Sequence, residues 1–258
     1  MTNDDGRITV YLLHGIYGAK EYWLPLARTL AQAGYRVIAW NAPGYGFATP
    51  PQPFTFDVVA EAGARLIRAT GSERNVVFGH SMGGQITPRI LQKVPERVHA
   101  AVITSTIGYF GNRTPAEQEQ FVKARTAAPA PGTDPREATL AVVNSMFAAG
   151  SQGPAVDLVR IVAAQTPPAT VQAAVKAIQA NTDDQAVAAF KAIEVPTLLV
   201  AGELDHVGYP AGMQRIAQMI SDSEFAVVSA SGHYPWAENP ADFAPLLLDF
   251  LGRHLRER

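Results

Sequence analysis

Short apolar runs recur along the chain and alternate with longer stretches of helical periodicity. Six of these runs are almost continuously apolar, which is typical of strands buried on both faces of a parallel sheet. The predicted strands are Ile8–Leu13, Tyr35–Trp40, Asn75–Phe78, Ala101–Thr104, Thr197–Ala201 and Phe225–Ser229. The predicted helices are Tyr22–Ala33, Thr55–Thr70, Gly83–Lys93, Pro210–Ile220 and Ala241–Arg256. This alternation predicts an α/β fold with a mostly parallel sheet of about six strands.

One long segment interrupts the alternation. Residues 107–193 contain Ala-rich helical pieces separated by Pro/Gly breaks, and no strand pattern. A segment of this length is too structured to be a loop. We therefore expect an α/β core formed by residues 1–106 and 194–258, and a helical cap formed by residues 107–193 over one end of the sheet.

A candidate nucleophile follows the third predicted strand. The sequence Gly79-His80-Ser81-Met82-Gly83-Gly84 lies between that strand and a helical pattern. A G-x-S-x-G motif in this context places its serine on a tight strand-to-helix turn above the sheet edge. The N–H groups of the following helix favour negative charge developing at the same point. Ser81 is therefore the predicted nucleophile.

The serine needs a base, and the chain contains six histidines. His233 follows the last predicted strand and so reaches the same carboxyl edge of the sheet as Ser81, where catalytic groups of α/β folds gather. His206 is the second choice because it shares a loop with the acidic candidates. His80 is expected to point away from Ser81, and His14 is expected to brace the loop after the first strand.

The base in turn needs a carboxylate to orient it. Asp205 in Gly202-Glu203-Leu204-Asp205 follows the fifth predicted strand and gives the chain order Ser, Asp, His. Glu203 is the alternative. The backbone N–H groups of Met82 and Ile16 are the expected oxyanion-hole donors, since both residues follow strand ends near Ser81.

These motifs resemble those of the α/β-hydrolase superfamily. The residues that carry the resemblance are His14-Gly15-x-x-Gly18 with Trp23, Pro43-Gly44-Tyr45-Gly46, Gly79–Gly84, Gly202-x-x-Asp205, and Gly232-His233 followed by Glu238-x-Pro240. The chain looks most similar to the esterase and enol-lactonase-like branch with an inserted helical cap. Most members have two further strands before the His-Gly strand. Here that strand begins near residue 8, so about six strands are expected instead of eight.

Composition narrows the possible functions. The 258 residues include 21 Lys and Arg, 23 Asp and Glu, and no Cys, giving a formal net charge of −2. The absence of Cys excludes disulfides and cysteine nucleophiles. The near-zero net charge argues against nucleic-acid or membrane partners. The polar, acidic start of the chain and the lack of an apolar run of ~18 residues favour a cytoplasmic protein. A small-molecule substrate is expected, without a cofactor or a metal.

The predicted activity is hydrolysis of a small, largely uncharged ester or lactone through an acyl-enzyme. The expected cap has seven basic and seven acidic residues and no basic cluster along its sequence. Apolar side chains of the cap are candidates for the pocket wall: Tyr109, Phe110, Met146 and Phe147. Relatives also use this scaffold for cofactor-free oxygenation or haloperoxidase chemistry, for carbon–carbon bond hydrolysis, and as ligand receptors, so these alternatives stay open.

Overall fold

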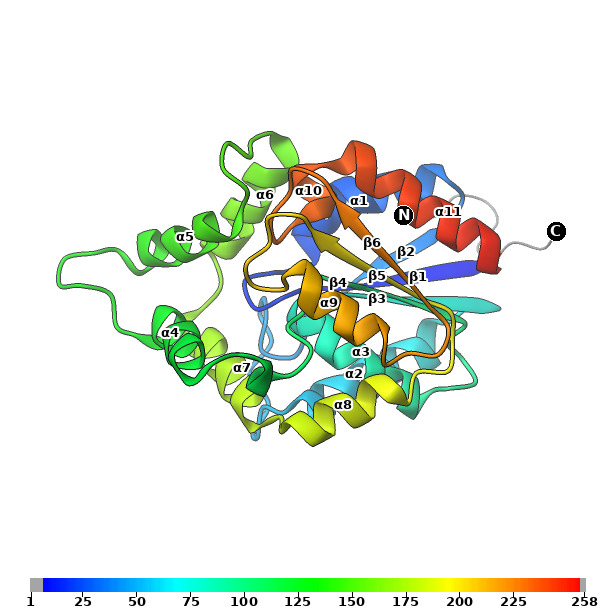
Figure 1. Cartoon of the computed structure of the whole chain (residues 1–258), viewed down its shortest axis with the longest axis horizontal. Helices are drawn as coiled ribbons and strands as arrows, with labels where there is room; N and C mark the ends of the chain where they lie inside the picture. The colour runs from blue at the N-terminus through cyan, green and yellow to red at the C-terminus, as the bar shows by residue number, and fades with distance from the viewer. Residues whose placement is uncertain (1–6, 256–258) are drawn as a thin grey trace.

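Six strands form one parallel sheet in the computed structural model, which describes residues 7–255 (Figure 1). The strand order is β2-β1-β3-β4-β5-β6, and every neighbouring pair is parallel. The strands are β1 (Ile8–Leu13), β2 (Arg36–Ala39), β3 (Arg74–His80), β4 (Ala100–Thr104), β5 (Thr197–Gly202) and β6 (Ser223–Val228). All six predicted strands are present, which confirms the α/β-hydrolase fold class.

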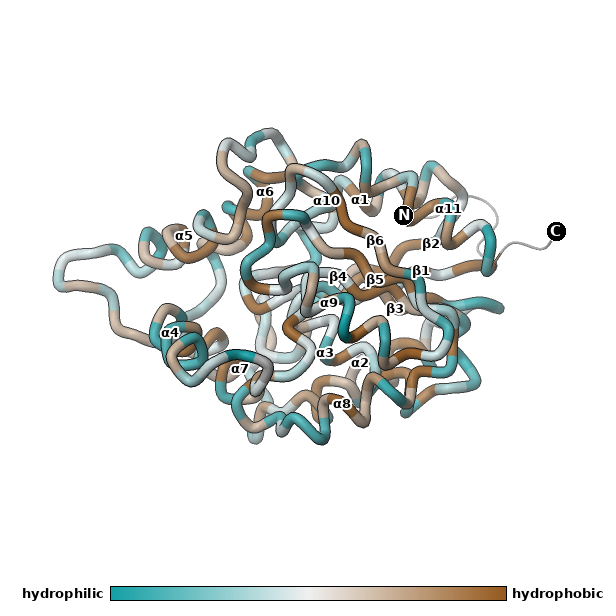
Figure 2. The backbone as a smooth tube through the Cα atoms, viewed as in Figure 1, coloured by the Kyte–Doolittle hydropathy of each residue, from teal (hydrophilic) through white to brown (hydrophobic). Residues whose placement is uncertain are grey.

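Helices cover both faces of the sheet. In Figure 1, α1 (Leu24–Gln32) and α11 (Pro240–Leu255) lie on one face, and α2 (Phe56–Thr70) and α3 (Met82–Lys93) lie on the other. The helix α9 (Pro210–Ala217) packs against β5 and β6. In Figure 2 the hydrophobic residues concentrate on the strands, which the helices cover. The four central strands are buried almost throughout, which explains their continuous apolar pattern.

Two short helical elements lie close to the sheet edge. The 3-10 helix η1 (Lys20–Trp23) precedes α1, and α10 (Pro235–Glu238) precedes α11. The sequence predicted one helix from Tyr22, but the α-helix begins at Leu24, with a proline in its first turn. The side chains of Tyr22 and Trp23 in η1 are buried instead of belonging to a surface helix.

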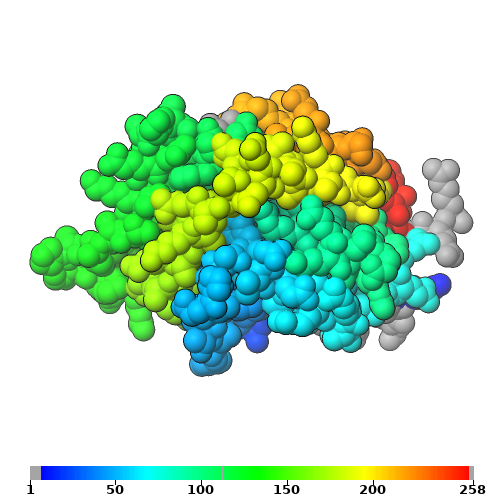
Figure 3. All heavy atoms as spheres, turned by 90° about the horizontal axis from the view of Figure 1, so that it is seen from below, coloured from blue at the N-terminus to red at the C-terminus, as the bar shows by residue number. Residues whose placement is uncertain are grey.

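The segment between β4 and β5 is helical throughout its regular structure, and we call residues 107–193 the cap segment. It contains η2 (Phe110–Asn112), α4 (Pro115–Thr126), α5 (Pro135–Met146), α6 (Pro154–Ala163), α7 (Pro168–Ala180) and α8 (Asp183–Lys191). Side-chain caps fix the starts of three of these helices at Thr114, Asp134 and Thr182. Figure 3 shows the cap segment projecting from one end of the molecule, coloured green to yellow-green.

The cap segment is attached at the carboxyl edge of the sheet. The Thr170 hydroxyl of α7 donates to the Gly44 carbonyl oxygen at 2.9 Å, and α6 contacts both η1 and α10. The far end of the segment returns to the core, where α8 packs against α3. Across residues 7–255, no helix has both the length and the hydropathy needed to cross a membrane.

Candidate active site

Ser81 lies at the turn between β3 and α3 in a backbone conformation that L-residues rarely adopt. Its φ is 52° and its ψ is −114°. Such a conformation costs about 1–3 kcal/mol and persists only when the surroundings impose it. Two glycines permit the turn: a Cβ on Gly79 would lie 2.4 Å from the Gly83 carbonyl oxygen, and one on Gly83 would lie 2.3 Å from the Leu13 carbonyl oxygen. This is the geometry of a nucleophile elbow.

A buried carboxylate–imidazole pair lies at the same edge of the sheet. His233 Nδ1 is 3.0 Å from Asp205 Oδ2 and 3.1 Å from Oδ1, and the exposed fractions of the two side chains are 3% and 0%. Asp205 Oδ1 also accepts from the Val207 and Gly208 N–H groups at 2.7 and 3.0 Å. Burial raises the pKa of Asp205, but the His233 contact and these hydrogen bonds together hold it below its usual value.

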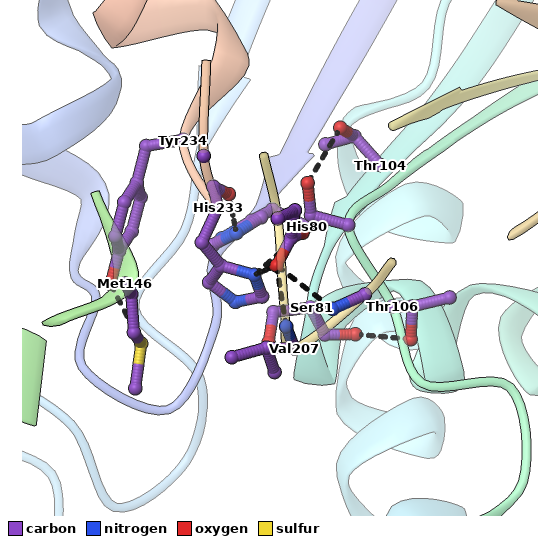
Figure 4. A network of polar contacts seen from close by, with 12 residues as sticks. His80, Ser81, Thr104, Thr106, Met146, Val207, His233 and Tyr234 are labelled. Carbon is purple, nitrogen blue, oxygen red and sulfur yellow. Dashed lines mark hydrogen bonds and ion pairs between the residues drawn. The ribbon is translucent and has the colours of Figure 1, made fainter. Parts of the chain in front are cut away.

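The ionised Asp205 fixes the tautomer of the histidine. A carboxylate can only accept, so Nδ1 carries a proton, and in the neutral ring Nε2 is the nitrogen with the lone pair. His233 and Ser81 line the same cavity and are drawn together in Figure 4. No hydrogen bond joins their side chains among the described contacts; such catalytic hydrogen bonds commonly tighten only when substrate binds.

The backbone around His233 is held by the cap segment and by Glu238. The His233 N–H donates to the Met146 carbonyl oxygen at 2.9 Å. The Glu238 carboxylate accepts from the N–H groups of both flanking residues, Gly232 at 3.0 Å and Tyr234 at 2.9 Å. It also accepts from two cap-segment groups, the Ala148 N–H at 2.8 Å and the Ser151 hydroxyl at 2.7 Å. The sequence motif Glu238-x-Pro240 gives no indication of this role.

A second set of hydrogen bonds reaches His233 from the core. His80 Nε2 is 3.0 Å from the His233 carbonyl oxygen, so Nε2 carries the proton and donates. His80 Nδ1 then accepts from the Tyr22 hydroxyl at 2.9 Å, and the same hydroxyl accepts from the Gly15 N–H at 2.9 Å. Burial, and next the proximity of His233, lower the pKa of His80 well below its usual value, which keeps the ring neutral. His80 therefore supports the site without facing Ser81 as a base.

The loop after β1 is braced as expected by His14. Its Nε2 accepts from the Ala42 N–H at 3.0 Å, and its Nδ1 donates to the Gly15 carbonyl oxygen at 2.8 Å. This loop places Ile16 in the cavity wall together with Met82. Among the described contacts, neither N–H of these two residues has an acceptor within the protein. Two unpaired backbone donors at the cavity of a serine form a candidate oxyanion hole.

The alternative acid and base candidates, Glu203 and His206, lie in different surroundings from Asp205 and His233. Glu203 is exposed, and one of its carboxylate oxygens accepts from the Ala230 N–H at 2.9 Å, so it caps a turn. His206 is exposed and lies in a separate surface pocket, lined also by Arg113, Glu117 and Arg125. Neither Glu203 nor His206 lines the Ser81 cavity.

The cavity at Ser81 is small, with a volume of about 20 Å³. Of the four apolar cap residues expected in its wall, Met146 is present and the other three are not. Phe147 packs against the Tyr234 ring at 4.9 Å between centroids, and Phe110 packs against Phe121 at 5.5 Å. Tyr109, Phe110 and Phe147 are thus not among the residues that line the cavity in this structure, and the last two pack against other aromatic rings. Instead, Ile107, Phe121 and Ile178 supply its apolar cap surface.

Two polar residues of the wall carry no signal in the sequence. Arg125 of α4 and Gln85 of α3 both line the cavity. The sequence showed balanced charges in the cap, but the fold brings Arg113 and Arg125 to the same phenylalanine, Phe121, at 5.6 and 3.7 Å from the ring centroid. Spacing along the chain gave no signal for this, since twelve positions separate the two arginines. Among residues 7–255, no group of three His, Cys, Asp or Glu side chains is placed to hold a metal ion.

The chain matches known proteins in both family and fold. A family model described as alpha/beta hydrolase fold matches residues 8–240. The polyketide synthase ThaQ of Burkholderia thailandensis is 28% identical over 96% of this chain, which spans 12% of the length of that relative. The pimeloyl-[acyl-carrier protein] methyl ester esterase of Neisseria meningitidis is 27% identical, over 94% of this chain and 93% of its own. The crystal structure of the enol-lactonase from Burkholderia xenovorans superimposes with a TM-score of 0.81, at 20% identity over 97% of this chain and 94% of that chain.

Proposed function

Because the chain belongs to the alpha/beta hydrolase fold family, we propose that it is a serine hydrolase that cleaves a small ester or lactone. One observation carries the proposal. The strained Ser81 turn, the buried Asp205–His233 pair and the two unpaired N–H groups of Ile16 and Met82 all meet at one cavity. Each of these groups has a separate task in acyl transfer, and no single packing requirement would gather them.

The geometry supports the following chemistry. His233 Nε2 takes the proton of the Ser81 hydroxyl as Oγ attacks the substrate carbonyl carbon, and the carbonyl oxygen gains the negative charge. The Ile16 and Met82 N–H groups stabilise that oxyanion. The intermediate then collapses: the bond to the leaving oxygen breaks, and His233 returns the proton to it. A water molecule, deprotonated by the same histidine, hydrolyses the acyl-enzyme and restores the serine.

The cavity wall favours a compact substrate with an uncharged reacting end. Ile16, Met82, Met146 and Val207 give this part of the wall an apolar surface. The cavity volume of about 20 Å³ is far below the usual range for small-molecule sites, about 300–1,000 Å³, so a substrate needs the wall to open around it. In this proposal the cap segment acts as a lid that sets substrate size and excludes water, which strengthens the oxyanion interactions. The names of the methyl ester esterase and the enol-lactonase agree with an ester or lactone substrate.

The test compares Ser81→Ala with Ser221→Ala, a matched change at an exposed serine after α9. Turnover of p-nitrophenyl acetate and butyrate and labelling by a fluorophosphonate are measured for both variants. We expect Ser81→Ala to lose about 10⁴-fold or more in kcat and all labelling, while Ser221→Ala keeps both. Wild-type turnover by Ser81→Ala would exclude Ser81 as the nucleophile and overturn the proposal.

A further inference from the structure

Thr106 binds the peptide group that joins the candidate nucleophile to a candidate oxyanion donor. Its hydroxyl, on the segment that follows β4, donates to the Ser81 carbonyl oxygen at 2.8 Å (Figure 4). That carbonyl and the Met82 N–H belong to one planar trans peptide, so they point in opposite directions. A hydrogen bond at the oxygen therefore also sets the direction in which the Met82 N–H points.

The orientation of this peptide needs support because it is unusual. Rotation about the Ser81 Cα–C bond sets it, and the ψ of −114° at Ser81 belongs to a backbone conformation that is rarely adopted. On the other side of the nucleophile, the Ser81 N–H donates to the Thr104 carbonyl oxygen at 2.9 Å. Both peptide groups of Ser81 are therefore bound by residues at the carboxyl end of β4.

Thr106 can orient another group because its own position is fixed. Its side chain is buried, and Ser105 before it is 0% exposed and has a φ of 54°. Such a conformation persists only where the surrounding structure imposes it. The Ser105 N–H donates to the Val200 carbonyl oxygen at 3.1 Å. Gly208 packs directly on this backbone, since a Cβ there would lie 2.3 Å from the Ser105 carbonyl carbon.

Gly84 leaves the space that Thr106 occupies. A Cβ on Gly84 would lie 2.9 Å from the Thr106 Cβ, which is closer than side chains approach one another. Gly79 and Gly83 permit the turn at Ser81, whereas Gly84 lets Thr106 reach that turn. The second glycine of the Gly83-Gly84 pair therefore has a separate task, which is to admit the hydroxyl donor.

We propose that Thr106 is a positioning residue of the hydrolase, and that its hydroxyl aims the Met82 N–H at the oxyanion. This inference rests on the proposed hydrolase function. Thr106 touches no reacting atom and acts through the Ser81–Met82 peptide. Its hydrogen bond also polarises that peptide, which makes the Met82 N–H a stronger donor.

The size of the effect follows from what remains when the hydroxyl is lost. Removing one oxyanion donor outright lowers kcat by about 10²–10³-fold. Without the Thr106 hydroxyl the Ser81 carbonyl oxygen still accepts from the Gly84 N–H at 2.9 Å, so the peptide is loosened but not released. We therefore expect a smaller loss in kcat, about 10- to 100-fold. KM should stay nearly unchanged, because the donor acts on charge that develops only in the transition state.

The experiment measures kcat and KM for p-nitrophenyl butyrate in Thr106→Val, which removes the hydroxyl, and in Thr106→Ser, which keeps it. Thr106→Val should show the loss in kcat, and Thr106→Ser should recover most of it. Thr197→Val is the matched control, because Thr197 is 1% exposed and its hydroxyl donates to the Val195 carbonyl oxygen at 2.9 Å, at the opposite end of the sheet. It should lose stability to urea as Thr106→Val does, with kcat unchanged. If Thr106→Val does not fold, Thr106→Ala replaces it, since it brings no methyl group toward the Ser81 carbonyl.

The rate of Ser81 labelling by a fluorophosphonate separates this inference from the hydrolase function. The phosphonyl oxygen needs the same N–H donors, so Thr106→Val should be labelled about 10- to 100-fold more slowly than the wild type. If no ester is turned over but this difference is found, the hydrolase function fails and the role of Thr106 stands. Equal kcat in Thr106→Val and Thr197→Val, equal losses in Thr106→Val and Thr106→Ser, or a change confined to KM would overturn that role even where ester hydrolysis is strong. A wild type that neither turns over esters nor is labelled would overturn both.

Discussion

Replacing Glu238 tests how the proposed base is held. The carboxylate accepts four hydrogen bonds and so joins the two residues that flank His233 to the start of the loop after α5. Oε2 receives three of them, and Oε1 receives the Tyr234 N–H. Glu238→Gln keeps one oxygen acceptor. Its NH₂ group must then face an N–H donor, so at least one hydrogen bond is lost.

The expected magnitude follows from which donors are buried. Gly232, Tyr234 and Ala148 are buried, whereas Ser151 is partly exposed and can bind water instead. Leaving one buried N–H without an acceptor costs about 1–3 kcal/mol, so Glu238→Gln should destabilise the protein by that amount. In Glu238→Ala all three buried donors lose their acceptor, and the loss should be about 3–9 kcal/mol. Because two of the freed N–H groups lie on either side of His233, a misplaced imidazole should also lower kcat by up to about 10²-fold.

Urea denaturation and ester turnover measure the two effects separately. Glu194→Gln is the matched control, since Glu194 is exposed before β5 and the same change there should alter neither quantity. The reasoning is refuted if Glu238→Gln is as stable as this control. A loss of stability with unchanged kcat would mean that Glu238 fastens the cap segment but does not position the base.

Two further predictions concern the buried ionisable groups. Asp205→Asn should lower kcat by about 10⁴-fold with the fold retained, because a carboxamide NH₂ facing Nδ1 favours the tautomer whose Nε2 cannot accept a proton. The control Glu203→Gln changes a turn cap, and its kcat should stay near that of the wild type. The reverse pattern would assign the acid role to Glu203. Stability should fall as pH drops from about 6.5 to about 4, because burial lowers the pKa of His14 to about 4 and the unfolded chain then binds the extra proton. A pKa of about 4 in the folded chain, against an ordinary value of 6.5, gives His14 alone a contribution of about 3 kcal/mol to this loss. Urea denaturation of His14→Gln across the same pH range should show a correspondingly shallower slope.

The fold was predictable because its signals are local. Buried parallel strands are apolar at almost every position, so their pattern does not depend on which helices cover them. The positions of Ser81, Asp205 and His233 follow from the same fact, since residues after parallel strands must meet at one edge of the sheet. Order along the chain was therefore enough to bring these residues together.

The cavity wall was not predictable in the same way. Whether a cap residue faces the cavity depends on how each helix is rotated against its neighbours, and the sequence of one helix does not determine that rotation. Met146 and Phe147 are adjacent, yet only Met146 lines the cavity. The position of Arg125 in the cavity wall also depends on helix rotation. Its helix α4 has a weak amphipathic pattern and a mostly exposed surface, so the sequence of α4 does not indicate that Arg125 lines the cavity.

The contacts around His233 also limit how the cap segment can move. The His233 loop is held from the core through His80 and Tyr22, and from the cap segment through the Met146 carbonyl and the Ala148 N–H bound to Glu238. A lid that swung away at the end of α5 would break the hydrogen bonds that orient the base. Substrate entry that keeps the site intact must therefore leave this end of α5 in place.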